Sequence, residues 1–320
     1  MKKNSKIYVA GHRGLVGSAI VKLLKKKGFR KIILRNRNQL DLKKQIQVNN
    51  FFQKHKPEIV IIAAAKVGGI YANNNFQANF IYENLMIQNN LINSSYENKV
   101  KKVIYLGSSC IYPKNSKQPI KENYLLSGEL ESTNISYAIA KIAGLVMCDS
   151  YNRQYKNSTD FRCLMPTNLY GPGDNYHGLN SHVIPALIKR FHYAKKNKKK
   201  VIKVWGNGLA KREFLFSEDL AKAIFLILKL SKSKYKKYLL PNINHINIGS
   251  GQEYTIKNLA KLISNIVGFN GKIVFDKSKP TGTMRKFLSN RISKKLGWKP
   301  SIKLKDGIIR TYEEFKKINS

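Results

Sequence analysis

Five residues near the middle of the chain have the types and spacing needed for redox chemistry at a carbonyl. Tyr137 and Lys141 stand four residues apart, so the phenol and the ammonium project from one face of a helix. A phenol titrates near about 10 and needs a neighbouring cation, such as Lys141, to exchange protons near neutral pH. Upstream, the hydroxyl of Ser108 or Ser109 can hold the reacting oxygen, and Cys110 adds a softer acid/base. The combination predicts redox chemistry at a carbonyl together with a separate proton transfer at carbon.

A glycine-rich turn near the N-terminus predicts a dinucleotide site. Gly11, Gly14 and Gly17 lie between the first predicted strand and the first predicted helix. The strand covers Ile7–Ala10, and the amphipathic helix extends to Lys27. Glycines there permit a tight turn and close approach of a pyrophosphate, which then meets the N–H groups of the helix N-terminus.

The residues after the second predicted strand, Lys31–Leu34, favour NADP(H) over NAD. An acidic residue at this point would hold a ribose 2′-hydroxyl, whereas Arg37 suits a 2′-phosphate. Arg13, inside the glycine turn, adds a second cation nearby. On a chain this basic, either arginine could instead be ordinary surface charge.

Strand and helix patterns alternate through the first half of the chain. Near-continuous apolar runs predict further strands at Ile59–Ala65, Lys102–Leu106 and Phe161–Met165. One long helical pattern runs from about Asn75 to Glu97 between them. This alternation predicts an α/β fold built on a Rossmann-like, doubly wound parallel sheet.

The alternation stops after Tyr170-Gly-Pro172, where loops lengthen and become rich in Pro, Gly, aromatic and basic residues. We therefore expect a smaller, interleaved α/β lobe in the C-terminal half. The expected division assigns residues 1–170 to an NADP-binding Rossmann domain, with 214–250 returning to it. Residues 171–213 and 251–320 are assigned to a substrate-binding lobe.

The charge of the chain is unusual: 59 Lys and Arg against 18 Asp and Glu give a formal net charge of +41. Such a field attracts polyanions and speeds the capture of small anions. The basic residues are spread through every segment, and no zinc-finger spacing or basic zipper accompanies them. Specific nucleic-acid binding is therefore not expected.

The cysteines and the apolar runs favour a cytoplasmic protein. Cys110, Cys148 and Cys163 are an odd, sparse set without CxxC spacing, which argues against a disulfide framework. The first apolar run stops at Gly11, and the longest later run, 223–228, is far too short for a membrane span. We expect no membrane association.

Seven motifs together resemble the extended short-chain dehydrogenase/reductase family, and within it the enzymes that form GDP-L-fucose. The motifs are Ala10–Ala19, Ala63–Ile70, Leu106–Lys114, Tyr137–Gly144, Ser150–Tyr155, Met165–Pro172 and Asn180–Leu187. The glycine turn and the Tyr-x-x-x-Lys pair occur across the whole superfamily. The Ser-Ser-Cys element, taken with Ser-His-Val-Ile-Pro at 181–185, is far more specific.

The resemblance implies a two-step reaction on GDP-4-keto-6-deoxy-D-mannose that consumes NADPH. In the 3,5-epimerisation, Cys110 is the expected base and His182 the expected acid. In the reduction of the 4-keto group, Tyr137 is expected to protonate the oxygen while Lys141 supports the phenol and the nicotinamide ribose. Ser108 is expected to hydrogen-bond and polarise the carbonyl oxygen in both steps.

The resemblance also implies the binding residues, and it implies no metal. The expected cofactor contacts are Gly11, His12, Arg13, Gly14, Leu15, Val16, Gly17, Arg37, Asn38, Gln39, Leu40, Asp41, Leu42, Leu106, Gly107, Ser108, Ser109, Lys141, Pro166, Thr167, Asn168, Leu169 and His182. Arg190, Trp205 and Arg212 are the expected GDP-sugar contacts, because arginine suits a diphosphate and tryptophan can cover a sugar face. Thr281 stands where the family often has an acidic residue, so it can share a hydrogen bond but supplies no charge.

Two other interpretations remain open. A redox-neutral nucleotide-sugar epimerase or dehydratase would use the same scaffold without net consumption of NADPH, and a non-catalytic polyanion-binding protein would carry a damaged active site. The helical segments 84–98 and 137–155 are where the superfamily pairs two subunits, so a homodimer is expected by analogy.

Overall fold

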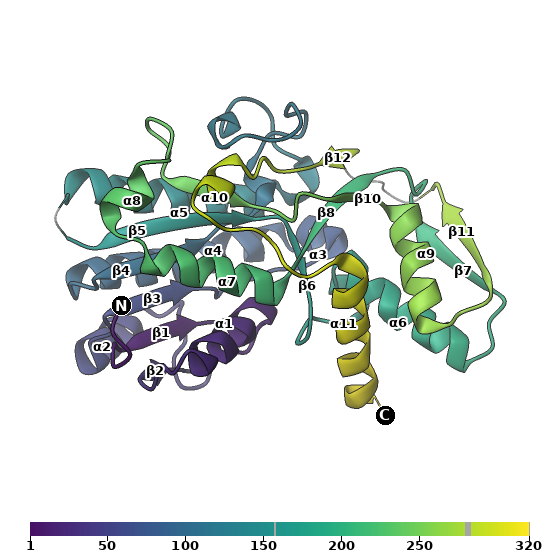
Figure 1. The fold of residues 1–320 in the computed structure, drawn as a ribbon, viewed down its shortest axis with the longest axis horizontal. Helices are drawn as coiled ribbons and strands as arrows, with labels where there is room; N and C mark the ends of the chain where they lie inside the picture. The colour runs from purple at the N-terminus through teal and green to yellow at the C-terminus, as the bar shows by residue number, and fades with distance from the viewer. Residues whose placement is uncertain (157, 279–282, 320) are drawn as a thin grey trace.

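The computed structural model describes residues 1–156, 158–278 and 283–319, and its centre is a six-stranded parallel sheet (Figure 1). The strand order is β2-β1-β3-β4-β5-β9, and every neighbouring pair is parallel. The strands are β1 (Ile7–Ala10), β2 (Ile32–Ile33), β3 (Ile59–Ile62), β4 (Lys102–Leu106), β5 (Asp160–Pro166) and β9 (His245–Ile248). The order turns back at β1, with β2 on one side and β3 on the other, as in doubly wound sheets.

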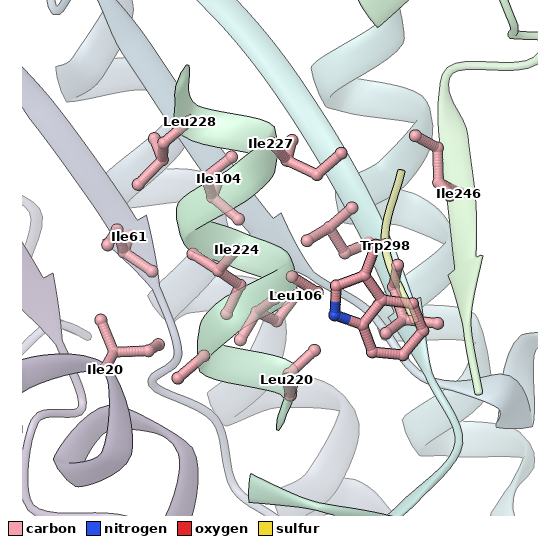
Figure 2. Packing of buried hydrophobic residues seen from close by; sticks show 14 of the residues in the cluster. Ile20, Ile61, Ile104, Leu106, Leu220, Ile224, Ile227, Leu228, Ile246 and Trp298 are labelled. Atoms are coloured by element: carbon pink, nitrogen blue, oxygen red, sulfur yellow. The ribbon is translucent and has the colours of Figure 1, made fainter. Parts of the chain in front are cut away.

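Helices cover both faces of this sheet because alternate strand residues point to opposite sides. On β1, Ile7 and Val9 face α1 and α7, while Tyr8 and Ala10 face α2, α4 and α5. The helices are α1 (Leu15–Lys26), α7 (Ser217–Lys229), α2 (Gln45–His55), α4 (Gln77–Glu97) and α5 (Ile135–Gln154). Figure 2 shows the first of these faces, where Ile224 of α7 and Ile104 of β4 belong to the same buried cluster.

A second group of elements has a core of its own. Its strands are β6 (Asn168–Tyr170), β8 (Lys211–Phe216), β10 (Glu253–Thr255) and β12 (Arg285–Lys286) in one sheet, and β7 (Val201–Trp205) with β11 (Lys272–Asp276) in another. Its helices are α6 (Val183–Lys196), α9 (Ile256–Val267) and α11 (Leu304–Asn319). Phe191, Ile263 and Phe315 are fully buried between them.

The remaining elements are short. They are α3 (Ile70–Asn75), α8 (Lys232–Lys236) and α10 (Arg291–Lys295), together with the 3₁₀ turns Ser109–Ile111, Glu122–Tyr124, Ser132–Asn134 and Gly178–Asn180. Among the described residues, no helix is long and apolar enough to cross a membrane.

Backbone hydrogen bonds tie the loop after β4 to the segment around β12. Ile120 N donates to Phe287 O at 2.7 Å, and Ser289 N donates to Ile120 O at 2.8 Å. Phe287 N in turn donates to the side chain of Gln118 at 2.9 Å. We call this set of residues, Gln118, Ile120, Phe287 and Ser289, the cross-lobe clamp. It joins the loop that begins with the Ser-Ser-Cys element to the C-terminal part of the chain.

The doubly wound α/β fold predicted from the sequence is confirmed. The long helix predicted from about Asn75 to Glu97 is confirmed as α4, which begins at Gln77. The short helix α3, which directly precedes α4, was not predicted. The two helices separate at Phe76, whose backbone (φ −123°, ψ 39°) is not helical. The break leaves α3 as an independent short element beside the active-site cleft.

Candidate active site

A cleft of about 990 Å³ opens at the carboxyl ends of β1, β3, β4 and β5, where ligands bind in sheets of this kind. Most of the residues predicted from the sequence line it: Gly11, His12, Arg13, Gly14, Leu15, Val16, Arg37, Leu40, Asp41, Leu42, Gly107, Ser108, Ser109, Cys110, Tyr137, Pro166, Thr167, Asn168, Leu169, His182 and Arg212. Gly17, Asn38, Gln39, Leu106, Lys141, Arg190 and Trp205 are not among the lining residues, and Thr281 lies outside the described residues.

The glycine turn has no room for side chains. Gly11 has φ +81°, and a Cβ there would lie 2.7 Å from the backbone of Ala64. A Cβ on Gly17 would lie 2.1 Å from Gly11 O, so the first turn of α1 packs directly on the loop. The turn therefore forms a cradle of bare backbone at a helix N-terminus, which suits the pyrophosphate of a dinucleotide.

Two arginines follow β2, and the structure distinguishes them. Arg35 Nη1 donates to its neighbour Leu34 O at 2.8 Å, and its Nη2 lies 3.1 Å from His55 Nε2. Arg37 is exposed at the cleft and has no hydrogen-bond or ion-pair partner within the described chain. Gln39 does not reach the cleft; instead it shares two hydrogen bonds of 3.1 Å with Asn36 that fix the turn. Of these two arginines, Arg37 is the one available to bind a phosphate group in the cleft.

Lys141 is buried behind Tyr137 and is 3% exposed. Its Nζ donates to Leu106 O at 2.9 Å and lies 5.1 Å and 5.8 Å from the ring centroids of Tyr105 and Tyr137. Burial lowers the pKa of Lys141 to about 8. The ammonium form therefore predominates at neutral pH but is lost within the alkaline range.

Tyr137 is held as a neutral phenol. Burial raises its pKa, the nearby Cys110 raises it further, and a hydrogen bond with the Ser108 side chain opposes them. A phenol in that state can donate a proton to an oxygen that becomes negative. Ser108, which lies on the same wall of the cleft, can bind the same oxygen.

A buried hydrogen-bond network sets the position of α5. Tyr105 Oη donates to Gln88 Oε1 at 2.8 Å and lies 3.2 Å from Lys141 O, while Gln88 Nε2 donates to Ala140 O at 2.6 Å. A Cβ on Gly144 would lie 2.4 Å from Tyr105 Oη, so only glycine lets the helix come this close. The network connects α4, β4 and α5 directly beneath Tyr137.

Cys110 sits in a short 3₁₀ turn whose first N–H groups are capped by Ser108: Cys110 N donates to Ser108 Oγ at 3.2 Å. The amide Nδ2 of Asn134 lies 3.7 Å from Cys110 Sγ and donates to it. Below the turn, Tyr112 Oη donates to Asn247 Oδ1 of β9 at 2.6 Å, which anchors the loop to the sheet. The turn is therefore fixed by Ser108 and by the anchor of Tyr112 on β9, and Asn134 contacts the thiol itself.

His182 lines the same cleft as Cys110 but comes from another part of the chain, at the N-terminus of α6. Solvent reaches its ring within the cleft, yet the surrounding protein lowers its pKa by desolvation. The imidazole is therefore neutral at pH 7 in the ligand-free protein, with one nitrogen protonated and one free to accept.

Arg190 and Trp205 lie together but apart from the main cleft. The Arg190 guanidinium is 5.9 Å from the Trp205 ring centroid and donates to Lys203 O at 3.1 Å. Arg190 lines a second cavity of about 480 Å³ along α6 and β7. Arg212 alone of the predicted GDP-sugar arginines reaches the main cleft, where burial lowers its pKa and the neighbouring Cys110 and Glu131 oppose that effect.

Several cleft residues were missed by the sequence analysis. Among the described residues, six buried side-chain atoms lack a hydrogen-bond partner, and four of them belong to the cleft. One is Nδ1 of His12, which was predicted; the three that were missed are Asn73 Oδ1, Asn134 Oδ1 and Asp174 Oδ2. Glu131 also lines the cleft and accepts from Thr283 Oγ1 at 2.9 Å. Unpaired buried polar atoms of this kind mark places where a ligand completes the hydrogen bonding. Only Asp174, beside a Gly-Pro-Gly turn, carried a local sequence signal.

The sheet, the glycine turn and the Tyr137–Lys141 pair define a short-chain dehydrogenase/reductase. Residues 7–249 match the NAD dependent epimerase/dehydratase family, and the chain belongs to that family. Among curated relatives, Putative GDP-L-fucose synthase 2 of Arabidopsis thaliana is 52% identical over 98% of this chain and 92% of its own length. GDP-L-fucose synthase of Escherichia coli (strain K12) is 48% identical over 97% of this chain and 96% of its own. The resemblance inferred from the motifs is confirmed.

Solved structures agree with this placement. A GDP-6-OMe-4-keto-L-xylo-heptose reductase from C. jejuni superposes with a TM-score of 0.93 at 41% identity, covering 100% of this chain and 99% of that one. A GDP-L-fucose synthetase from Naegleria fowleri, bound to NADP, superposes with a TM-score of 0.88 at 28% identity, covering 100% and 96%. Within the described residues, no group of His, Cys, Asp or Glu side chains could hold a metal ion.

The two glycines of the turn should respond differently to alanine. Gly17→Ala places a Cβ against backbone, so we expect a lower melting temperature as well as weaker NADPH binding. In Gly14→Ala the Cβ lies 3.5 Å from Gly11 O, an ordinary contact, so the melting temperature should hold while NADPH affinity falls about tenfold. Thermal unfolding and NADPH fluorescence titration measure both. Equal loss of stability in the two variants would contradict the steric argument.

Proposed function

We propose that this enzyme converts GDP-4-keto-6-deoxy-D-mannose to GDP-L-fucose, by 3,5-epimerisation followed by NADPH-dependent reduction at C4. The observation that carries the proposal is one cleft lined by two sets of groups: Tyr137 and Ser108 for a carbonyl, and Cys110 with His182 for protons at carbon. Lys141 supports the first set from its buried position behind Tyr137. The names of the relatives at about 50% identity support it. A plain ketoreductase has no use for the second set.

Cys110 and His182 are proposed to perform the epimerisations. A hydrogen bond from Ser108 polarises the C4 carbonyl, which makes the protons on C3 and C5 acidic. The Cys110 thiolate removes a proton from one face of the ring, and His182, once protonated, returns one to the opposite face. The Asn134 amide, 3.7 Å from Cys110 Sγ, can stabilise the thiolate.

Tyr137 is proposed to complete the reduction. NADPH, when bound, supplies the hydride for C4. The Tyr137 phenol donates its proton to O4, and the Lys141 ammonium, held by Leu106 O at 2.9 Å, stabilises the resulting phenolate. We propose that the glycine turn holds the pyrophosphate and that Arg37 and Arg13 hold the 2′-phosphate. The backbone cradle and the unpartnered His12 Nδ1 fit such a ligand.

The GDP moiety is proposed to bind the C-terminal part of the chain. Arg212 reaches the main cleft, and Trp205 with Arg190 forms a flat cationic surface beyond it. Guanidinium groups suit a diphosphate, and the indole can cover the base or the ribose. We therefore retain the expected division, in which residues 171–213 and 251–320 bind the nucleotide sugar.

Activity measurements on three variants test the assignment. We expect wild type to oxidise NADPH, followed at 340 nm, with GDP-4-keto-6-deoxy-D-mannose and to release GDP-L-fucose. Cys110→Ser, His182→Gln and Tyr137→Phe should each lower the rate by about 10²- to 10⁴-fold, because each removes a proton-transfer group. His177→Gln, an exposed histidine outside the cleft lining, is the matched control.

Two results would redirect the assignment. Turnover of the sugar without NADPH consumption would favour a redox-neutral epimerase or dehydratase. NADPH oxidation that survives loss of Cys110 and His182, with an unepimerised product, would leave a simple ketoreductase.

The buried lysine predicts an alkaline limit to activity. Because the pKa of Lys141 is about 8, its ammonium form is present below that pH and is lost above it. We expect kcat/KM for NADPH, which reports the free enzyme, to fall as pH rises through about 8. Lys141→Arg keeps its charge, so its residual activity should lack this decline. A wild-type profile that is flat to pH 9.5 would contradict the assignment.

We also propose a cytoplasmic homodimer joined through α4 and α5, which pack side by side (Figure 1). The two helices carry large apolar side chains that the monomer leaves exposed, among them Tyr82, Ile139 and Val146. Pairing these helices with a second copy would bury that surface in a four-helix bundle.

Sedimentation can test the dimer. Val146 is 46% exposed on α5, so Val146→Glu should convert a dimer to a monomer by placing charge in the interface. Val201, 48% exposed on β7, supplies the control Val201→Glu, which should sediment like wild type. A monomeric wild type, or a dimeric Val146→Glu, would count against this interface.

A further inference from the structure

Asn73 is the one residue of the short helix α3 that is both buried and part of the cleft wall with an unused polar atom. It is 8% exposed, and its amide nitrogen donates to Gly68 O at 2.8 Å and to Gly69 O at 3.1 Å. Its Oδ1 is buried without any hydrogen-bond partner. The amide nitrogen of Asn73 is thus hydrogen-bonded, whereas its carbonyl oxygen, which is an acceptor, is not.

The orientation of this amide is determined by its neighbours. Gly68 and Gly69 present carbonyl oxygens, which only accept hydrogen bonds, so the NH₂ group must face them. A flipped amide would set two oxygens against each other. Oδ1 is therefore fixed as the free atom, and it requires a donor that the protein does not provide.

The position of α3 indicates which ligand supplies the donor. The helix packs against the turn Ser132–Asn134, whose last residue contacts Cys110, and against the turn Gly178–Asn180, which leads to His182. Gly69 N donates to Asn180 O at 3.0 Å, which ties the Asn73 loop to the second turn. Asn73 therefore borders the part of the cleft between the two proposed epimerisation residues. The glycine turn and Arg37 belong instead to the proposed NADPH site.

We propose that Asn73 Oδ1 accepts a hydrogen bond from a ring hydroxyl of the nucleotide-linked sugar. The proposal rests on the proposed function, because that function places a sugar between Cys110 and His182. A ring that loses and regains protons on both faces has to be held by its remaining hydroxyls. A fixed acceptor in the wall meets that need without covering either face.

Binding measurements separate the sugar from the nucleotide. In the presence of NADP⁺, isothermal titration calorimetry gives the Kd of GDP-L-fucose and of GDP. We expect Asn73→Ala to weaken GDP-L-fucose about tenfold, as for loss of one hydrogen bond, and to leave GDP unchanged. Asn75→Ala is the matched control: Asn75 is exposed on the same helix, bonds only Tyr71 O, and lies outside the cleft lining.

A second variant separates the acceptor from the loop contacts. Asn73→Asp keeps acceptor oxygens but loses the donors to Gly68 and Gly69. We therefore expect its ratio of the Kd of GDP to the Kd of GDP-L-fucose to be higher than that of Asn73→Ala. Equal loss in both variants would mean that the amide acts only by holding the loop, and would overturn the proposal. An unchanged Asn73→Ala, or a rise only in the Kd of NADP⁺, would overturn it as well.

The outcome is distinguishable from that of the proposed function. Binding of GDP-L-fucose requires no turnover. If the wild type oxidises no NADPH but still binds GDP-L-fucose more tightly than GDP, and Asn73→Ala loses that difference, the proposed reaction is rejected while the proposed Asn73 contact stands. A wild type that binds GDP-L-fucose no better than GDP would overturn the contact, whatever its activity.

Discussion

The buried ammonium of Lys141 is the constraint on which the catalytic half of the structure depends. A charge removed from water needs close partners, and the carbonyl of Leu106 and the ring of Tyr105 supply them. Tyr105 then needs a partner for its own hydroxyl, which Gln88 provides from α4. One buried cation therefore fixes β4, α4 and α5 relative to one another, and Tyr137 is aimed into the cleft as a result.

Buried polar groups in the cleft wall are less completely hydrogen-bonded than those around Lys141. Lys141, Tyr105 and Gln88 each have a hydrogen-bond partner for their buried polar atoms, whereas His12, Asn73, Asn134 and Asp174 each keep a buried polar atom without a partner. Each such atom costs about 1–3 kcal/mol in the free protein. The two apolar layers on the faces of the sheet offset that cost, which allows the site to be built for its ligands before they arrive.

Local sequence patterns predicted most of the fold and the chemically reactive part of the site. The apolar run Lys102–Leu106 is β4 with the same bounds, because a strand buried on both faces is a continuous run of apolar residues. The contact between Glu131 and Thr283 spans 152 residues, and no local pattern can encode it. Asn73 lies between the predicted elements, and its burial depends on turns that are distant in the sequence. Asn38 and Gln39 were placed at the cofactor by the family resemblance, but they do not line the cleft.

The cross-lobe clamp attaches the loop that carries Cys110 to the C-terminal part of the chain as well as to the parallel sheet. Its bonds run mainly between backbone atoms, from Ile120 to Phe287 and Ser289, so most side-chain substitutions along it leave them in place. Any rotation of the C-terminal part against the sheet must carry this loop with it. Under the proposed function, nucleotide binding by the C-terminal part and the position of the Cys110 thiol are therefore coupled, and a mutation that weakens the first also disturbs the second.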